Sequence, residues 1–137
     1  MSFSVNYLAV LVAALASFVL GALWYSPALF ARQWVAAHSY TPEKIQAMKR
    51  GMARTYLLSF VCFLVTAWVL AVFIDRMALL SWLGGAKLGA LAWFGFAATI
   101  GLTANLYSDK PLLAWIIDAG YQLVYLVGMG IILAVWR

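Results

Sequence analysis

The stretch that decides the fold is Leu112–Trp136, LLAWIIDAGYQLVYLVGMGIILAVW. A helix that crosses a bilayer needs about 20 apolar residues, and this run meets that requirement with one charged side chain, Asp118. A carboxylate inside a bilayer costs several kcal/mol unless it is partnered, protonated or hydrated. The stretch therefore predicts a transmembrane helix, and Asp118 is the first candidate for a functional residue.

The composition indicates an integral membrane protein. Of the 137 residues, 67% are hydrophobic and 9% are charged, whereas a soluble domain is about half apolar and a quarter charged. The mean hydropathy is +0.98. The net charge of +5 comes from basic residues between apolar runs, where they meet lipid headgroups. We therefore expect one domain, residues 1–137, with the lipid bilayer as its partner and no nucleic acid.

Three more runs have the length and composition of transmembrane helices. With the stretch above they give four predicted spans, Val5–Ser26, Ala53–Ile74, Gly85–Leu106 and Leu112–Trp136. Proline bounds two of them, because Pro27 cannot donate the next helical hydrogen bond and Pro111 suits a first turn. The last two connections are short, so the helices that they join should pack antiparallel. The fold class is thus predicted as an all-α integral membrane bundle of four transmembrane helices.

The long connection after the first span is predicted to contain a short amphipathic segment. Residues Pro27–Ala37 are expected to form a short helix. Thr41 then suits an N-cap and Pro42 the first turn of another helix. This second helix is either an interfacial amphipathic helix or an extension of the second span.

The basic residues also predict the orientation of the chain. The side with the first and third connections carries six of the nine, and the opposite side carries three: Arg32, Lys44, Lys49, Arg50, Arg54 and Lys110, against Arg76, Lys87 and Arg137. Because basic loops stay in the cytoplasm, we expect both termini to lie outside it.

Stripes of small and polar residues predict which helix faces point inward, since helices in bilayers associate through close packing and hydrogen bonds. Their members recur at helical spacing: Ala9, Ala13, Ser17 and Gly21; Thr55, Ser59, Cys62 and Thr66; Gly95, Thr99 and Thr103; Asp118, Tyr121, Gln122 and Tyr125. The third span has a second stripe, Ala97, Gly101 and Asn105. We expect that stripe to face another copy of the chain, which gives a homo-oligomer.

The depths of the polar residues predict one pocket in the cytoplasmic half of the bundle. Asp118 lies about 10 Å from the start of its span at 1.5 Å per residue. Tyr25 and Asn105 lie near the ends of their spans that face the same side. The candidate residues for binding a ligand, proton or cation are Asp118, Gln122, Tyr121, Tyr25, Asn105, Thr103 and Trp24.

Three segments carry a resemblance to a known family: Asn6–Phe30, Trp93–Phe96 and Ile117–Tyr121. With these segments the chain resembles, over nearly its whole length, the bacterial membrane proteins grouped as domain-of-unknown-function family 1761. The resemblance implies a small four-span protein of the bacterial inner membrane and implies no activity. In that family a histidine often follows the tyrosine of the last segment, whereas this chain has Gln122.

Three roles stay open at this point. A protonated Asp118 can hold the bundle together through hydrogen bonds. Alternatively, the chain is a small homo-oligomeric transporter or channel that uses Asp118 as a proton or cation site. A third alternative is an accessory subunit of another membrane complex.

An enzyme is not expected, and neither a metal site nor a cofactor is expected. The sequence has no HExxH motif, no paired cysteines and no glycine-rich phosphate loop. Asp118 alone cannot serve as both the acid and the base of a reaction. The single cysteine, Cys62, is expected to be a packed thiol, and the single histidine, His38, a solvated loop residue. Whether a small molecule or an ion binds is left open.

Overall fold

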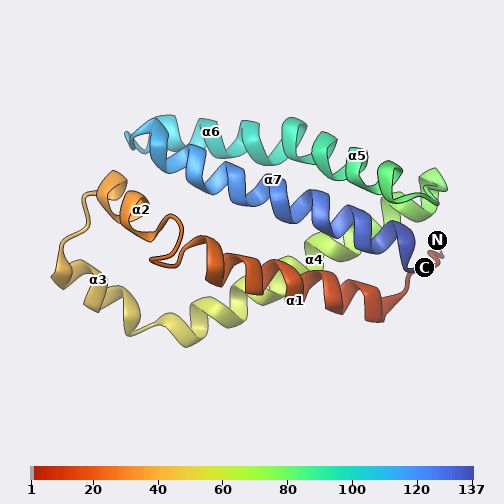
Figure 1. The fold of residues 1–137 in the computed structure, drawn as a ribbon, viewed down its shortest axis with the longest axis horizontal. Helices are drawn as coiled ribbons and strands as arrows, with labels where there is room; N and C mark the ends of the chain where they lie inside the picture. Colours follow the sequence, from red (N-terminus) through yellow and green to blue (C-terminus); the bar gives the residue numbers. More distant parts are fainter. Residues whose placement is uncertain (1) are drawn as a thin grey trace.

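The computed structural model describes residues 2–137 and is built of helices that form an elongated bundle (Figure 1). Within the described residues, four helical segments are long and apolar enough to cross a membrane. They are α1 (Tyr7–Trp24), α4 (Met52–Met77), the continuous segment α5–η1–α6 (Trp82–Ala92, Trp93–Ala97 and Ala98–Tyr107) and α7 (Leu112–Val135). The predicted all-α fold with four spans is confirmed, and it indicates a multi-pass membrane protein.

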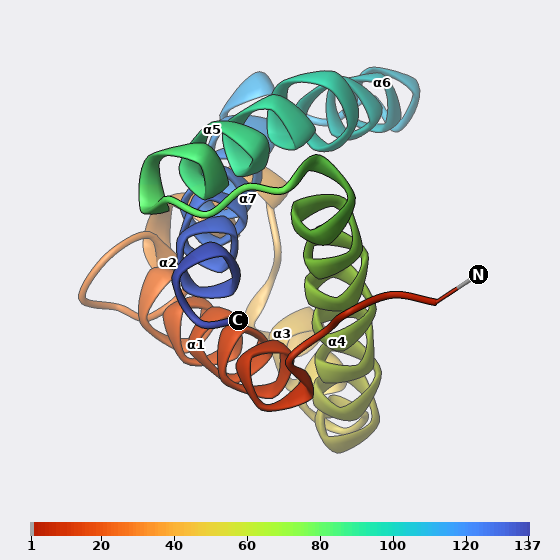
Figure 2. The same cartoon turned by 90° about the vertical axis from the view of Figure 1, so that its right-hand side faces the viewer.

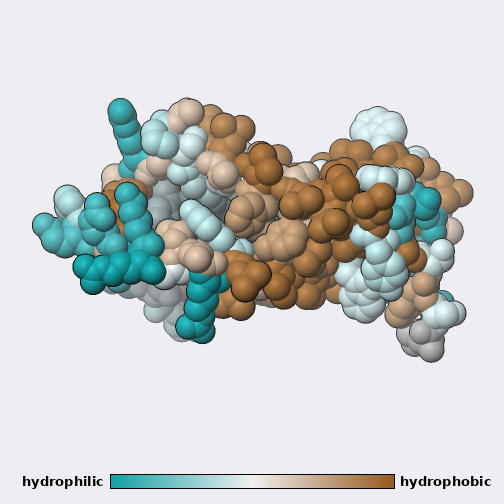
Figure 3. Space-filling model, turned by 90° about the horizontal axis from the view of Figure 1, so that it is seen from below, coloured by the Kyte–Doolittle hydropathy of each residue, from teal (hydrophilic) through white to brown (hydrophobic). Residues whose placement is uncertain are grey.

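The two ends of the bundle differ in composition. The short helices α2 (Ala31–His38) and α3 (Pro42–Lys49) lie at one end, and both termini lie at the other (Figure 1). The surface between the two ends is largely hydrophobic. Hydrophilic residues gather at the ends, and the larger group of them lies at the α2–α3 end (Figure 3). α7 packs against α1, α2, α4, α5, η1 and α6, and an end-on view shows it between α5 and α1 (Figure 2).

The second short helix, α3, begins where the sequence predicts, whereas α2 begins at Ala31 and not at Pro27. The Thr41 side chain accepts a hydrogen bond of 3.1 Å from the backbone N–H of Lys44, so it caps α3, and Pro42 follows in the first turn. At the other end of the molecule, Asn6 caps α1 in the same way. These side chains satisfy N–H groups that have no partner within their own helix.

The hydrophobic core lies in the half of the bundle nearest the termini. It is built from the start of α1 and the C-terminal halves of α4 and α7: Ala9, Val10, Ala13, Ala67, Leu70, Ala71, Ile74, Leu126, Met129, Leu133 and Ala134. The first predicted stripe is buried there, since Ala9 and Ala13 are fully buried and Ser17 is 3% exposed. Toward the α2–α3 end, α4 diverges, and most of its first half is exposed.

Two glycines bring α5 into backbone contact with α7. A Cβ atom on Gly85 would lie 2.0 Å from the carbonyl oxygen of Gly130, and one on Gly89 would lie 2.2 Å from that of Leu126. Only glycine permits such an approach. The Gly85/Gly89 pair is therefore the tightest part of the bundle.

The predicted inward face of α4 is not the face through which this helix packs. Thr55 and Cys62 are exposed, and α4 packs through the apolar residues Ala67, Leu70, Ala71 and Ile74. The Thr55 and Thr66 hydroxyls donate instead to carbonyls one turn back in their own helix, at 3.2 and 2.9 Å. A hydroxyl that donates to a carbonyl of its own helix needs no partner on another helix. The polar residues of α4 therefore did not identify the face that packs. Cys62 is also not the packed thiol that we expected.

The two stripes of the third span have exchanged roles. The Thr99 and Thr103 hydroxyls are exposed and donate to carbonyls of their own helix. Asn105, from the stripe expected to face another copy, is only 8% exposed and donates to Pro111 at the start of α7. The stripe predicted to face a second chain thus packs inside the bundle, and the other one is left on its surface.

Candidate functional site

Asp118 lies where α7 meets the end of α1 and the helix α2. Its Oδ1 accepts two hydrogen bonds, one of 2.5 Å from the Tyr25 hydroxyl and one of 3.1 Å from Nε1 of the Trp34 indole. Both hydrogen bonds that the structure gives to Asp118 end on this oxygen. The carboxylate is thus fixed on one side, and Oδ2 is left for another partner.

The proline break after α1 brings these two donors together. Pro27 has no N–H, and the carbonyl of Leu23 that it leaves free accepts the Ser26 hydroxyl at 2.6 Å. The chain then turns, and α2 packs against α7. As a result the rings of Tyr25 and Trp34 meet edge-on, with centroids 5.9 Å apart.

Two further indoles hold the backbone of α7 on either side of Asp118. Trp24 donates to the carbonyl of Ile117 at 3.0 Å, and Trp93 donates to that of Ala119 at 2.7 Å. Trp93 begins the π-helical segment η1, an element that often occurs at functional sites. The position of Asp118 is therefore fixed through its side chain and through both neighbouring peptide groups.

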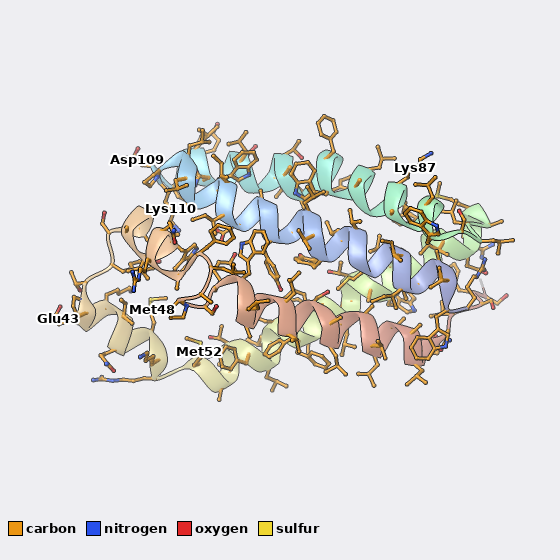
Figure 4. The ribbon with its side chains drawn as sticks, in the orientation of Figure 1. Glu43, Met48, Met52, Lys87, Asp109 and Lys110 are labelled. Atoms are coloured by element: carbon orange, nitrogen blue, oxygen red, sulfur yellow. The ribbon has the colours of Figure 1, made fainter. Side chains whose placement is uncertain are left out.

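A cavity of about 180 Å³ lies beside Asp118, between α2, α6 and α7. It is lined by His38, Gly101, Ala104, Asn105, Ser108, Lys110, Ala114, Trp115, Asp118, Ala119 and Gln122. Lys110 lies near α2 at the end of the bundle (Figure 4). Pockets for drug-sized ligands measure about 300–1,000 Å³, so this cavity suits water, an ion or a very small molecule.

One residue that lines the cavity has a buried acceptor without a donor. Asn105 donates through Nδ2 to the Pro111 carbonyl at 3.2 Å, but its Oδ1 has no hydrogen-bond partner within residues 2–137. Asp118, which lines the same cavity, presents a carboxyl group that accepts hydrogen bonds. A carboxylate in a polar cavity favours a ligand that donates hydrogen bonds or carries positive charge.

The ligand chemistry of the site is not that of a multidentate metal centre. Within residues 2–137 no group of three or more His, Cys, Asp or Glu side chains could hold a metal ion. Asp118 is the only carboxylate among the residues that line this cavity. The other polar residues of the lining are two amides, a hydroxyl and the basic residues Lys110 and His38. One carboxylate in this setting suits a proton, a monovalent ion or an ammonium group.

A family model matches residues 8–134, and its description is a protein of unknown function, DUF1761. The chain belongs to the DUF1761 family. The match covers nearly the whole chain and confirms the resemblance seen in the sequence, and its description assigns no activity. No curated protein and no solved structure matches the chain.

Most of the residues predicted for the site of this DUF1761 protein lie together. Asp118, Asn105 and Gln122 line the cavity, and Tyr25 and Trp24 hydrogen-bond to α7 at and beside Asp118. These contacts join residues that are up to 93 positions apart in the sequence.

Two predicted residues lie elsewhere. Tyr121 packs against Tyr25, with ring centroids 5.5 Å apart, but its hydroxyl donates to the Ser17 carbonyl at 2.6 Å. Tyr121 therefore connects α7 to α1 and does not line the cavity. Thr103 is exposed and hydrogen-bonds to Thr99 of its own helix, so the structure does not bring it to the site.

Sequence reasoning missed the contribution of α2. His38, expected to be a solvated loop residue, is half-buried and lines the cavity, with Nδ1 2.9 Å from the Trp34 carbonyl oxygen. Trp34, four residues earlier, donates to Asp118. Their four-residue spacing, after a proline break next to Tyr25, was a signal that they share a helix face.

Proposed function

We propose that this DUF1761 protein is a small transporter or channel subunit of the bacterial inner membrane in which the Asp118 carboxylate binds a proton or a small cation. One observation carries the proposal. Asp118 accepts two hydrogen bonds on Oδ1 and lines a polar cavity together with Asn105, whose Oδ1 is unpartnered.

The Asp118 carboxylate favours a bound ligand over an empty cavity. An ionised carboxylate in a membrane is costly, and a buried acceptor without a donor, such as Asn105 Oδ1, costs about 1–3 kcal/mol. A hydrated cation or an ammonium group next to Asp118 would reduce the first of these costs.

A purely structural role for Asp118 is the second candidate, and the same hydrogen bonds favour it. The Tyr25 and Trp34 donors join α1 and α2 to α7, and such bonds stabilise membrane bundles by about 0.6–2 kcal/mol. The two roles make different predictions for Asp118→Asn. The amide oxygen can still accept both hydrogen bonds, so that substitution removes the charge and keeps the connection.

The proposal includes orientation and assembly. The cavity lies at the end of the bundle where most basic residues lie, so by the positive-inside rule it opens to the cytoplasm and both termini lie outside. Four spans are few to enclose a path for an ion, so we also propose that the chain forms a homo-oligomer. The exposed face at Gly95, where an added Cβ would meet nothing within 4 Å, leaves room for close helix contact.

Native mass spectrometry in a mild detergent tests the assembly. A uniform homo-oligomer is expected. A monomer alone would contradict the assembly, and a stoichiometric unlike partner would favour the accessory-subunit role instead.

Proteoliposome flux measurements test the function. The proteins compared are wild type, Asp118→Asn and the matched control Asp109→Asn, and empty vesicles give the background. A dye inside the vesicles reports the movement of protons, potassium or tetramethylammonium. Asp109 is an exposed acid at the same end of the bundle. We expect wild type and Asp109→Asn to move at least one of these ions and Asp118→Asn to lose most of that flux while it stays folded. Flux equal in all three proteins, or no flux above empty vesicles, would contradict the proposal.

A further inference from the structure

A second, larger hollow opens on the side of the bundle. It has a volume of about 620 Å³ and runs between α1 and the exposed first half of α4. Ten residues line it: Phe18, Gly21, Ala22, Tyr25, Met52, Thr55, Tyr56, Ser59, Phe63 and Tyr121. We call it the lateral groove. Met52, one of these residues, lies at the start of α4 (Figure 4).

The lateral groove is rich in aromatic rings. Half of its lining residues are Phe or Tyr. Phe18 meets Tyr56 edge-on across the groove with centroids 5.7 Å apart, and Phe63 meets Tyr121 at 6.4 Å. The faces of aromatic rings attract cations, most strongly where water is excluded. The lining can therefore attract a cation, whereas a purely aliphatic surface would only accommodate an acyl chain.

The carboxyl group of Asp118 lies directly behind this aromatic lining. Tyr25 faces the lateral groove, and its hydroxyl donates at 2.5 Å to Asp118, which lines the smaller polar cavity. No residue among those that line the groove is charged. A cation in the groove would therefore be attracted by Asp118 across the Tyr25 ring, with little water between them to weaken the attraction.

We propose that the lateral groove binds a lipophilic cation, a bulky apolar body with one delocalised positive charge that enters from the bilayer. The proposal rests on the proposed function, because it uses the charge of Asp118. The volume lies in the range of pockets for drug-sized ligands, whereas the polar cavity beside Asp118 is too small for such a body. An acyl chain fits the same space but gains nothing from the carboxylate.

The test uses two probes of the same shape and opposite charge, tetraphenylphosphonium and tetraphenylborate. Equilibrium dialysis measures their binding to the full-length protein in lipid nanodiscs, with empty nanodiscs as the background. The variants are Ser59→Trp, which fills the groove, and Val61→Trp, which adds the same ring on an exposed face of α4. Asp118→Asn removes the charge.

We expect saturable binding of tetraphenylphosphonium and none of tetraphenylborate. Ser59→Trp and Asp118→Asn should each lower the affinity at least tenfold, and Val61→Trp should leave it unchanged. If Ser59→Trp does not fold, Ala22→Leu narrows the groove from α1 and should lower the affinity in the same way. Equal binding of both probes, or no loss on filling the groove, would overturn the proposal and leave a groove that holds lipid.

The outcome for the smaller cations separates this inference from the proposed function. If tetraphenylphosphonium does not bind while flux of protons or small cations still depends on Asp118, only the lateral groove proposal fails. If Asp118→Asn changes neither the probe binding nor the flux, both fail.

Discussion

The Tyr25 hydroxyl and Asp118 Oδ1 are joined by a 2.5 Å hydrogen bond that connects the end of α1 to α7. This bond lies in the half of the bundle where α4 diverges, outside the main apolar core. In that half, hydrogen bonds to α7 hold the helices together, as buried aliphatic side chains do near the termini. The same bond separates the polar cavity from the lateral groove.

Removing the Tyr25 hydroxyl should destabilise the fold modestly. Tyr25→Phe keeps the ring and deletes the donor, so we expect a loss of about 1 kcal/mol in the free energy of unfolding, the usual size for such bonds in membranes. Denaturation with sodium dodecyl sulfate in mixed micelles measures it. Tyr107→Phe is the control, because Tyr107 is 90% exposed. If both variants were as stable as wild type, the bond would have no structural importance.

The close contact of α5 and α7 should not tolerate a methyl group. Gly85→Ala would place its Cβ 2.0 Å from the Gly130 carbonyl oxygen, so the helices must separate. Overpacking of this kind costs about 1–3 kcal/mol. Gly95→Ala is the matched control in the same span, since its Cβ would meet nothing within 4 Å. Equal stability of the two variants in the same denaturation experiment would show that the helices do not touch here.

One substitution should stabilise the protein. Ala78 ends α4 with φ of 53°, a left-handed conformation that costs an L-residue about 1–2 kcal/mol and glycine very little. Ala78→Gly should therefore raise the midpoint of thermal unfolding. The control Ala16→Gly, in the middle of α1, should lower it, because glycine disfavours a helix interior by about 1 kcal/mol. A fall in the midpoint for both variants would contradict this reading of the α4 terminus.

Trp93 should stabilise the helix around Asp118. Trp93→Phe keeps an aromatic ring but removes the 2.7 Å hydrogen bond to the Ala119 carbonyl, which we expect to cost about 1 kcal/mol. Hydrogen exchange of the α7 amides near Asp118 should become faster. Trp82→Phe serves as the comparison, because Trp82 is 58% exposed. Unchanged exchange in Trp93→Phe would rule out this role.

The sequence was sufficient to predict the four spans and to place Tyr25 and Asp118 in the same part of the bundle. A helix that spans a bilayer must be long and apolar, so the spans follow from length and composition. The shared location follows from depth, since a carboxyl in a bilayer needs a polar neighbour at its own level. The small residues Ala9, Ala13 and Ser17 also marked the buried face of α1 correctly.

The remaining faces could not be predicted in the same way. Thr66 and Thr103 are polar but hydrogen-bond within their own helices, so their positions carried no information about neighbours. The path of α2 depends on its tertiary contacts with α7, and no periodicity in the sequence reports them. For this reason Trp34 and His38 were not expected at the site, although both lie beside Asp118.

Infrared difference spectroscopy of the Asp118 carboxyl tests the central claim most directly. Spectra of the reconstituted protein are recorded with and without each cation that the flux assay identifies, and across a pH titration. The account predicts a carboxyl band that shifts on binding or protonation and that is missing in Asp118→Asn. A spectrum in which no carboxyl band that depends on Asp118 responds to any cation or to pH would contradict it.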